Sequence, residues 1–148
     1  MNQVTPTVVR CTDEERVLRF LKKIDNTLPV SLSSRVDLVE FARENLERGY
    51  VFAIEDEEGE LACAAIFYYR FRSETAAYLD LMATVPGYGG RGYATAVMDA
   101  MESAAKKDGM VEFHLHTNDT NTAALSLYGK RGYRVIAHDP KVHMKKDL

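Results

Sequence analysis

Four glycines gather at one turn between an apolar segment and a helical pattern. The turn, Pro86-Gly87-Tyr88-Gly89-Gly90-Arg91-Gly92, follows the strand-like run 79–85 and precedes an amphipathic pattern from Tyr93 to Ala105. Glycines allow positive φ and close approach of the main chain to a ligand. Because the turn leads into a helix N-terminus, its N–H groups and the helix dipole favour an anion. The segment therefore predicts a phosphate site on residues 89–94.

A second motif follows roughly 30 residues later. It reads Asn121-x-x-Ala124-Leu125-x-Leu127-Tyr128-x-Lys130-x-Gly132-Tyr133 and predicts a short helix ending at Gly132. In this order, the two motifs resemble those of the GNAT superfamily of acetyl-CoA-dependent N-acetyltransferases. The family's pyrophosphate loop, Gln/Arg-x-x-Gly-x-Gly/Ala, falls on 89–94, with Gly89 in place of Gln or Arg. The second motif fits Asn-x-x-Ala-x-x-x-Tyr-x-x-x-Gly-Tyr/Phe at every position.

The order of predicted elements indicates a mixed α+β (α/β) chain of one domain over residues 1–148. One long crossover makes the strands 79–85 and 110–116 parallel, and hairpins connect most of the others. The resemblance implies the GNAT fold, a mostly antiparallel twisted sheet of about seven strands with that parallel pair splayed apart and about four helices. We expect strands over 7–10, 50–54, 61–71, 76–85, 110–116, 133–138 and 141–146, a first helix opened by a capping box at 12–15 and broken by 26–31, and helices over 34–48, 91–107 and 120–131.

Composition excludes several other classes of protein. A net charge of −3 without a Lys/Arg run argues against nucleic-acid binding and weakly favours a cationic or neutral amine as substrate. No apolar run approaches the ~20 residues of a membrane helix, and the N-terminus lacks the apolar core of a signal peptide. Cys11 and Cys63 form no disulfide framework or zinc spacing. Since Cys63 lies in an apolar run, we expect a buried thiol, a cytoplasmic protein and no metal.

The resemblance implies transfer of an acetyl group from acetyl-CoA to a primary amine by direct attack in a ternary complex. The acceptor would be a small-molecule or peptide amine, and a homodimer is compatible with the sequence. Backbone groups of Met82 and Thr84 would bind pantetheine, and Asn121 would contact CoA or merely cap its helix. The pyrophosphate would lie on Gly89, Gly90, Arg91, Gly92, Tyr93 and Ala94, with Arg91 either at a phosphate or in solvent.

Tyr128 is the candidate general acid, since the family's tyrosine at this position points at the CoA sulfur and a phenol of pKa ≈ 10 is protonated at pH 7. The alternative is that Tyr128 is only an aromatic residue of the hydrophobic core. The base is open, because the glutamate that some members use falls on Tyr78. Strand alternation places Tyr78, Asp80, Met82 and Thr84 on one face, so Asp80 is a possible base, an amine-steering group or a structural ion-pair partner.

Glu112, His114 and His116 also alternate onto one strand face, and His116 is a second candidate base. Without a third placed ligand, hydrogen-bonded neutral histidines fit better than a metal pair. Gly87-x-Gly89-x-x-Gly92 matches a dinucleotide fingerprint, but the single crossover argues against that fold. The stronger rival is a catalytically weak acyl-CoA-binding sensor or interaction module. The acceptor itself is open, and the resemblance implies that 26–34, the helix after it, 72–76 and the last hairpin shape its site.

Overall fold

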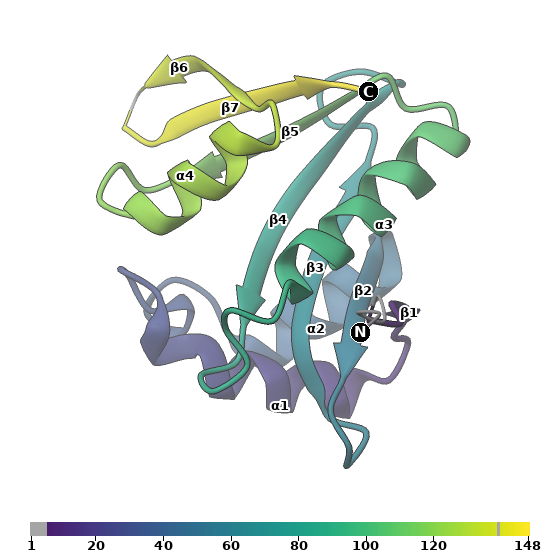
Figure 1. Cartoon of the computed structure of the whole chain (residues 1–148), viewed down its shortest axis with the longest axis vertical. Helices are drawn as coiled ribbons and strands as arrows, with labels where there is room; N and C mark the ends of the chain where they lie inside the picture. Colours follow the sequence, from purple (N-terminus) through teal and green to yellow (C-terminus); the bar gives the residue numbers. More distant parts are fainter. Residues whose placement is uncertain (1–5, 139) are drawn as a thin grey trace, which may run out of the picture.

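The computed structural model describes residues 6–138 and 140–148 and consists of one sheet with helices on both faces (Figure 1). The sheet has seven strands in the order β1-β2-β3-β4-β5-β7-β6, and only the β4–β5 pair is parallel. This architecture confirms the predicted fold class. The elements are β1 (Val9–Arg10), α1 (Glu14–Ile24), η1 (Asp25–Thr27), η2 (Leu32–Ser34), α2 (Leu38–Arg48), β2 (Tyr50–Glu55), β3 (Leu61–Tyr69), β4 (Ala76–Thr84), α3 (Tyr93–Lys107), β5 (Glu112–Thr117), α4 (Thr122–Lys130), β6 (Arg134–His138) and β7 (Val142–Asp147).

Two hydrophobic cores lie on opposite faces of the sheet. Apolar side chains of α1 and α2 pack on β2 and β3 on one face. On the other face, α3 and α4 pack against β3, β4, β5 and β7. Because each strand of the β2–β4 region is covered on both faces, the run 61–67 is apolar without alternation and every one of its residues is buried.

The first helix differs from its predicted start. Asp13, rather than Thr12, is the N-cap, because its carboxylate accepts two backbone N–H groups of the first turn at 3.0 and 3.3 Å. A carboxylate at this position also interacts favourably with the helix dipole. On the inner face Phe20 is fully buried, whereas Leu18 is half-buried.

The second helix begins at Leu38, four residues later than predicted. Asp37 caps it by accepting the Glu40 N–H at 3.1 Å, and residues 32–34 form a separate 3-10 turn. The segment between α1 and α2 is therefore longer than predicted, and it forms one wall of the cavity described below.

A β-bulge interrupts β4 at Asp80. Ile66 of β3 pairs with Leu81 while Phe67 pairs with Leu79, so Asp80 is the extra residue. Leu79 consequently packs in the α3-side core and Leu81 in the α1-side core. The bulge overturns the expected single face, since alternation restarts after Asp80.

Met82 and Thr84 accordingly lie on the opposite face from Tyr78. Met82 packs against the α3-side core, and the Thr84 hydroxyl lies 3.4 Å from the buried Cys63 sulfur of that core. Tyr78 lies with Tyr68 on the α2 side, their ring centroids 5.4 Å apart. Only Tyr78 and Asp80 of the predicted set remain on the same side.

The parallel strands β4 and β5 separate part-way along their length. Their pairing runs from Ala76 opposite Glu112 to Leu79 opposite Leu115. Beyond that point β4 continues to Thr84 and β5 to Thr117 with no register between them, and the strands diverge in Figure 1. The implied splayed wedge is thus present.

A carboxylate at the α3 side fixes the position of α4 and the strands after it. Glu102 of α3 is buried and accepts hydrogen bonds from the Tyr133 hydroxyl at 2.9 Å, Arg131 at 2.8 Å and Lys146 at 2.8 Å. These donors come from the end of α4, the residue before β6 and strand β7. Tyr128 on α4 is therefore held in a defined place relative to the wedge.

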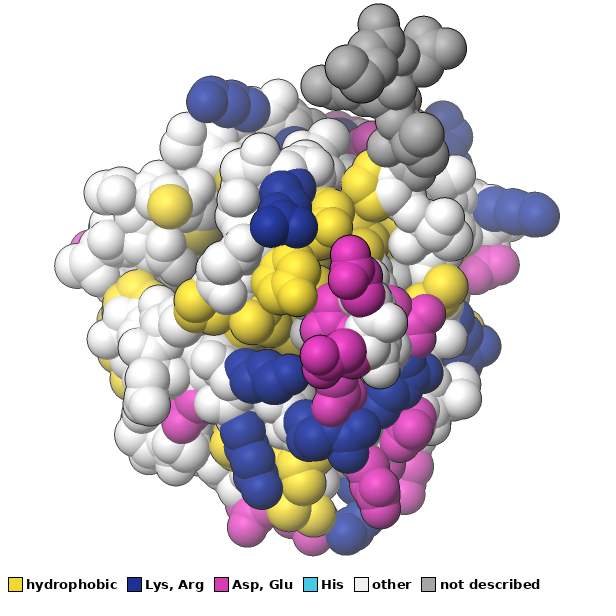
Figure 2. All heavy atoms as spheres, turned by 60° about the horizontal axis from the view of Figure 1, so that its bottom comes forward, with side chains coloured by type: hydrophobic (Ala, Val, Ile, Leu, Met, Phe, Trp, Pro, Cys, Tyr) yellow, Lys and Arg dark blue, Asp and Glu magenta, His cyan; other side chains and the backbone are white. Residues whose placement is uncertain are grey.

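The outer face of α1 and the β2–β3 turn carry charges of both signs. Arg16 pairs with Glu55 and Arg19 with Glu60, and Lys/Arg and Asp/Glu side chains are interspersed there in Figure 2. In the described part of the chain, no helix has both the length and the apolar content needed to cross a membrane.

Candidate active site

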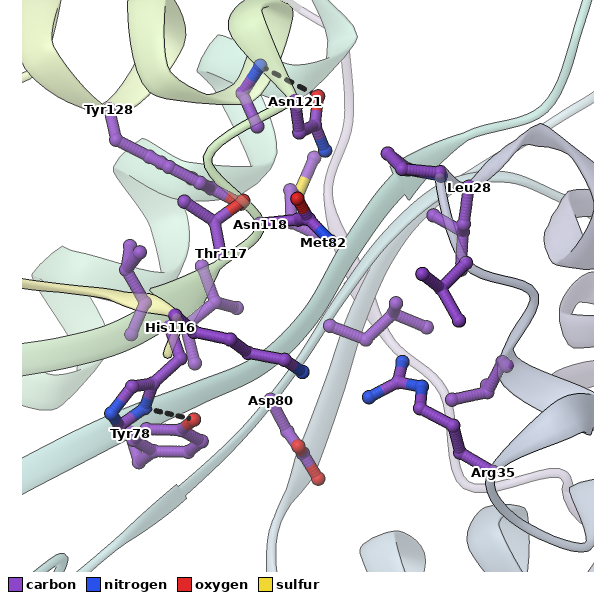
Figure 3. Close-up of a pocket in the computed structure, with 18 of the residues that line it drawn as sticks. Leu28, Arg35, Tyr78, Asp80, Met82, His116, Thr117, Asn118, Asn121 and Tyr128 are labelled. Atoms are coloured by element: carbon purple, nitrogen blue, oxygen red, sulfur yellow. Dashed lines mark hydrogen bonds between the residues drawn. The ribbon is translucent and has the colours of Figure 1, made fainter. Parts of the chain in front are cut away.

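A cavity of about 340 Å³ occupies the wedge between β4 and β5 (Figure 3). Its walls come from both splayed strands, from α4 and its preceding loop, from the segment between α1 and α2, and from Lys141 just before β7. The lining residues that carry polar groups are Arg35, Tyr78, Asp80, His116, Thr117, Asn118, Asn121, Tyr128 and Lys141.

The glycine turn lies at the N-terminus of α3, next to the end of β4. Gly90 and Gly92 have φ of 74° and 77°, a region that strains other residues, and Gly92 is the helix N-cap. The first helical bond joins the Ala96 N–H to the Gly92 carbonyl, so the N–H groups of 93–95 have no intrahelical partner. A Cβ built on any of the residues 89, 90 and 92 meets no atom within 4 Å, so the backbone faces open space.

Arg91 is exposed, and its side chain contacts the same turn. Its guanidinium donates to the Gly87 carbonyl at 3.3 Å and lies 5.0 Å from the Tyr88 ring centre. Gly89, where the family usually carries Gln or Arg, has no positive φ, so nothing in the backbone requires glycine at that position.

Tyr128 extends from α4 with its hydroxyl directed into the cavity (Figure 3). The ring is buried, with only 7% of the residue exposed, and packs edge-on to Tyr133 at 5.8 Å. Among the described residues no hydrogen bond reaches its hydroxyl. Burial raises the pKa of the phenol, so the group is protonated at pH 7 and has a free proton to donate.

Asn121 and Asp80 each make a structural contact while lining the cavity. The Asn121 side-chain oxygen accepts the Ala124 N–H at 3.2 Å and so caps α4. The Asp80 carboxylate accepts from the Arg48 guanidinium at 3.0 Å. Burial raises the pKa of Asp80, and the positive charge of Arg48 opposes that shift. The capping and ion-pair alternatives therefore hold for these residues, and neither excludes contact with a ligand.

Tyr78 and His116 form a hydrogen-bonded pair across the two splayed strands. The Tyr78 hydroxyl lies 2.8 Å from His116 Nδ1, and both residues line the cavity. Burial raises the pKa of Tyr78 to about 12 and lowers the pKa of His116. At pH 7 this pair is thus a neutral phenol bonded to a neutral imidazole.

His114, His143 and Glu112 continue as a chain away from His116. The Glu112 carboxylate can only accept, so His114 donates from Nε2 at 3.0 Å, and its Nδ1 then accepts from His143 Nε2 at 2.8 Å. The His116 and His143 rings lie 4.3 Å apart. These contacts confirm the expectation of hydrogen-bonded histidines. In the described residues, no group of three or more His, Cys, Asp or Glu side chains is arranged to hold a metal ion.

Sequence reasoning missed Arg35, Thr117, Asn118 and Lys141, which line the cavity without belonging to either motif. Arg35 and Lys141 come from the α1–α2 segment and the last hairpin, two of the regions expected to shape the acceptor site. The 72–76 turn, also expected there, contributes no lining residue. Phe71 beside it instead stacks on Tyr78 at 4.4 Å.

Comparisons with known proteins agree with this geometry. No curated protein matches the chain. The fold is similar to an acetyltransferase of the GNAT family from Staphylococcus aureus Mu50 (TM-score 0.79, 14% identity, covering 96% of this chain and 98% of that one). It is also similar to Ard1 from Thermoplasma volcanium (0.77, 19%, 98% and 99%). A third similar structure is the PaiA N-acetyltransferase from Thermoplasma acidophilum in complex with coenzyme A (0.73, 14%, 96% and 99%).

The sequence itself matches the Acetyltransferase (GNAT) family over residues 18–133, which is well over half of its length. This match includes both motifs, the splayed strands and Tyr128. The chain therefore belongs to the GNAT acetyltransferase family.

Proposed function

We propose that the protein is an N-acetyltransferase that moves the acetyl group of acetyl-CoA to a primary amine in a single ternary complex. The observation that carries the proposal is the wedge itself. The N-terminus of α3, whose free N–H groups suit an anion, lies next to the end of β4, and a buried phenol with a free hydroxyl proton lies on the cavity wall.

The backbone fits a CoA molecule at two places. Free N–H groups of the α3 N-terminus, with residues 89–94 around them, would bind the pyrophosphate. Past Leu79, β4 has no β5 partner, so the backbone of Met82 and Thr84 is available to pantetheine as an added strand would be. The CoA-bound PaiA neighbour shares this fold and supports the assignment.

Tyr128 acts as the general acid in this proposal. Acetyl-CoA supplies an activated thioester, so the amine nitrogen attacks its carbonyl carbon directly and the carbon–sulfur bond breaks. A backbone donor of β4 stabilises the charge that develops on the carbonyl oxygen. Tyr128 gives its hydroxyl proton to the departing sulfur and regains one from the medium. No acyl-enzyme is needed, because the thioester is already activated for direct attack, and both cysteines are buried.

The proton leaving the amine goes to the Tyr78–His116 pair. The Tyr78 oxygen accepts it while the Tyr78 hydroxyl proton passes to His116 Nδ1, 2.8 Å away. Asp80 is the second candidate base, and its ion pair with Arg48 makes it the weaker one.

Tyr128→Phe tests the proposal, since it removes only the hydroxyl. Free CoA release with a panel of amines should fall by roughly 10²–10⁴, while calorimetric CoA affinity stays unchanged. Wild-type turnover in the variant would show that Tyr128 is a packing residue. If the wild type bound CoA but acetylated no amine, the alternative of an acyl-CoA-binding module would be favoured. Gly89, which lacks the family's Gln or Arg side chain, is also consistent with that alternative.

A further inference from the structure

The acceptor end of the cavity holds more positive than negative charge. Its charged lining residues are Arg35, Asp80 and Lys141, and His116 beside them is neutral at pH 7. The single carboxylate among them, that of Asp80, already forms an ion pair with Arg48 at 3.0 Å. Among the described residues, Arg35 and Lys141 form no ion pair, so the excess positive charge faces the cavity.

Arg35 is held in position by the segment that carries it. The buried Asp25 carboxylate accepts the Ser33 N–H at 2.8 Å and the Ser33 hydroxyl at 2.5 Å. The Arg35 N–H then bonds the Leu32 carbonyl at 3.0 Å. These bonds fix the turn, and the guanidinium extends into the cavity from the side opposite Tyr128 (Figure 3).

Lys141 approaches the same space from the position just before β7. Burial lowers the pKa of its ammonium group, the nearby charge of Arg35 lowers it further, and the negative charge of Asp80 opposes the shift. Two cations that repel each other in a partly desolvated pocket are stabilised by an anion bound between them. Apolar side chains of Leu28, Val30 and Val36 line the rest of this wall, and Val30 and Val36 are exposed.

We propose that the acceptor amine carries an anionic group, a carboxylate or a phosphate, that Arg35 and Lys141 bind while the amine faces the thioester. This inference rests on the proposed acetyl transfer and names its substrate class. It reverses the expectation from net charge, because the molecule is acidic as a whole while the acceptor end of its cavity is basic.

Three primary amines of similar size test the proposal: β-alanine with a carboxylate, O-phosphoethanolamine with a phosphate, and ethanolamine with neither. Calorimetric titration with and without CoA measures their binding independently of turnover, so a failed acetyl transfer is seen separately. We expect at least one anionic amine to bind about tenfold or more tightly than ethanolamine. The ratio between the two anionic amines distinguishes a carboxylate site from a phosphate site.

Arg35→Gln and Lys141→Gln should each weaken binding of the preferred anionic amine by about tenfold or more. Binding of ethanolamine and of CoA should stay unchanged. Arg43→Gln is the matched control, since Arg43 is an exposed α2 arginine that pairs with Glu14 and Glu40 outside the cavity. The proposal would be overturned if ethanolamine bound as tightly as the anionic amines, or if none of the three amines bound. It would also be overturned if Arg35→Gln bound the preferred anionic amine as tightly as the wild type does.

Discussion

The buried histidine of β7 makes the stability of this protein depend on pH. His143 is only 5% exposed, and burial, reinforced by His116, His114 and Arg72, lowers its pKa to about 4. In the unfolded chain a histidine titrates near 6.5. Between these values the unfolded chain binds a proton that the folded chain does not, so stability falls as the pH falls from about 6.5 toward 4.

The size of the effect follows from the two pKa values. At about pH 5 the unfolded imidazole is almost fully protonated and the folded one almost neutral, which costs about 2 kcal/mol relative to pH 7.5. His143→Gln keeps an N–H donor for His114 but removes the titration. Urea unfolding at the two pH values should therefore show that the variant loses about 2 kcal/mol less stability than the wild type.

His138→Gln is the control, because His138 lies on β6 with a side chain 53% exposed. It should lose stability with falling pH as the wild type does. If His143→Gln lost as much as the wild type, the buried imidazole would not be neutral in the folded protein. The same result would also undermine the neutral state assigned to the neighbouring His116.

Three further predictions concern the cofactor loop, the support of α4 and the base. Gly89→Gln should tighten CoA binding up to about tenfold in calorimetry, because it restores the family's side chain where backbone and space allow one; unchanged affinity would place the pyrophosphate elsewhere. Glu102→Gln should lower the free energy of unfolding in urea by about 3 kcal/mol, because it breaks a buried ion pair. Asp99→Asn, which removes the exposed partner of Arg131, should lower it by less than about 1 kcal/mol. Tyr78→Phe should lower kcat about 10²-fold and remove the fall in rate at acidic pH that protonation of His116, with its lowered pKa, produces; an unchanged pH profile would favour Asp80.

The local geometry of the half that we propose for the cofactor could be predicted, because residues adjacent in sequence determine it. Positive φ at Gly90 and Gly92 and the free N–H groups of α3 depend on residues adjacent in sequence. The same holds for Asn121, which caps the helix that carries Tyr128. The acceptor half could not be predicted in this way. Arg35 and Lys141 lie far apart in the chain, and only the packing of the α1–α2 segment beside β7 brings them to one cavity.

Helix starts were misplaced wherever two capping residues compete. Thr12 and Asp13 are neighbours, and Ser34 and Asp37 both precede the apolar positions of α2. In each case the carboxylate is the cap. The outcome for α2 matters for the site, because the later start leaves Arg35 in the loop that faces the cavity instead of on a helix.

The bulge at Asp80 shows why alternation fails at the centre of the site. Leu79 and Leu81 look like one apolar face of a strand, yet they pack in opposite cores, and only the pairing with β3 reveals the extra residue. Under the proposed function, the inserted residue lets one strand contact both the acceptor and the cofactor. Before it, Tyr78 faces the acceptor side with His116. After it, β4 no longer pairs with β5, and its backbone is available to pantetheine. In the proposed reaction, the acetyl group would therefore be transferred at the bulge, where the two halves of the cavity meet.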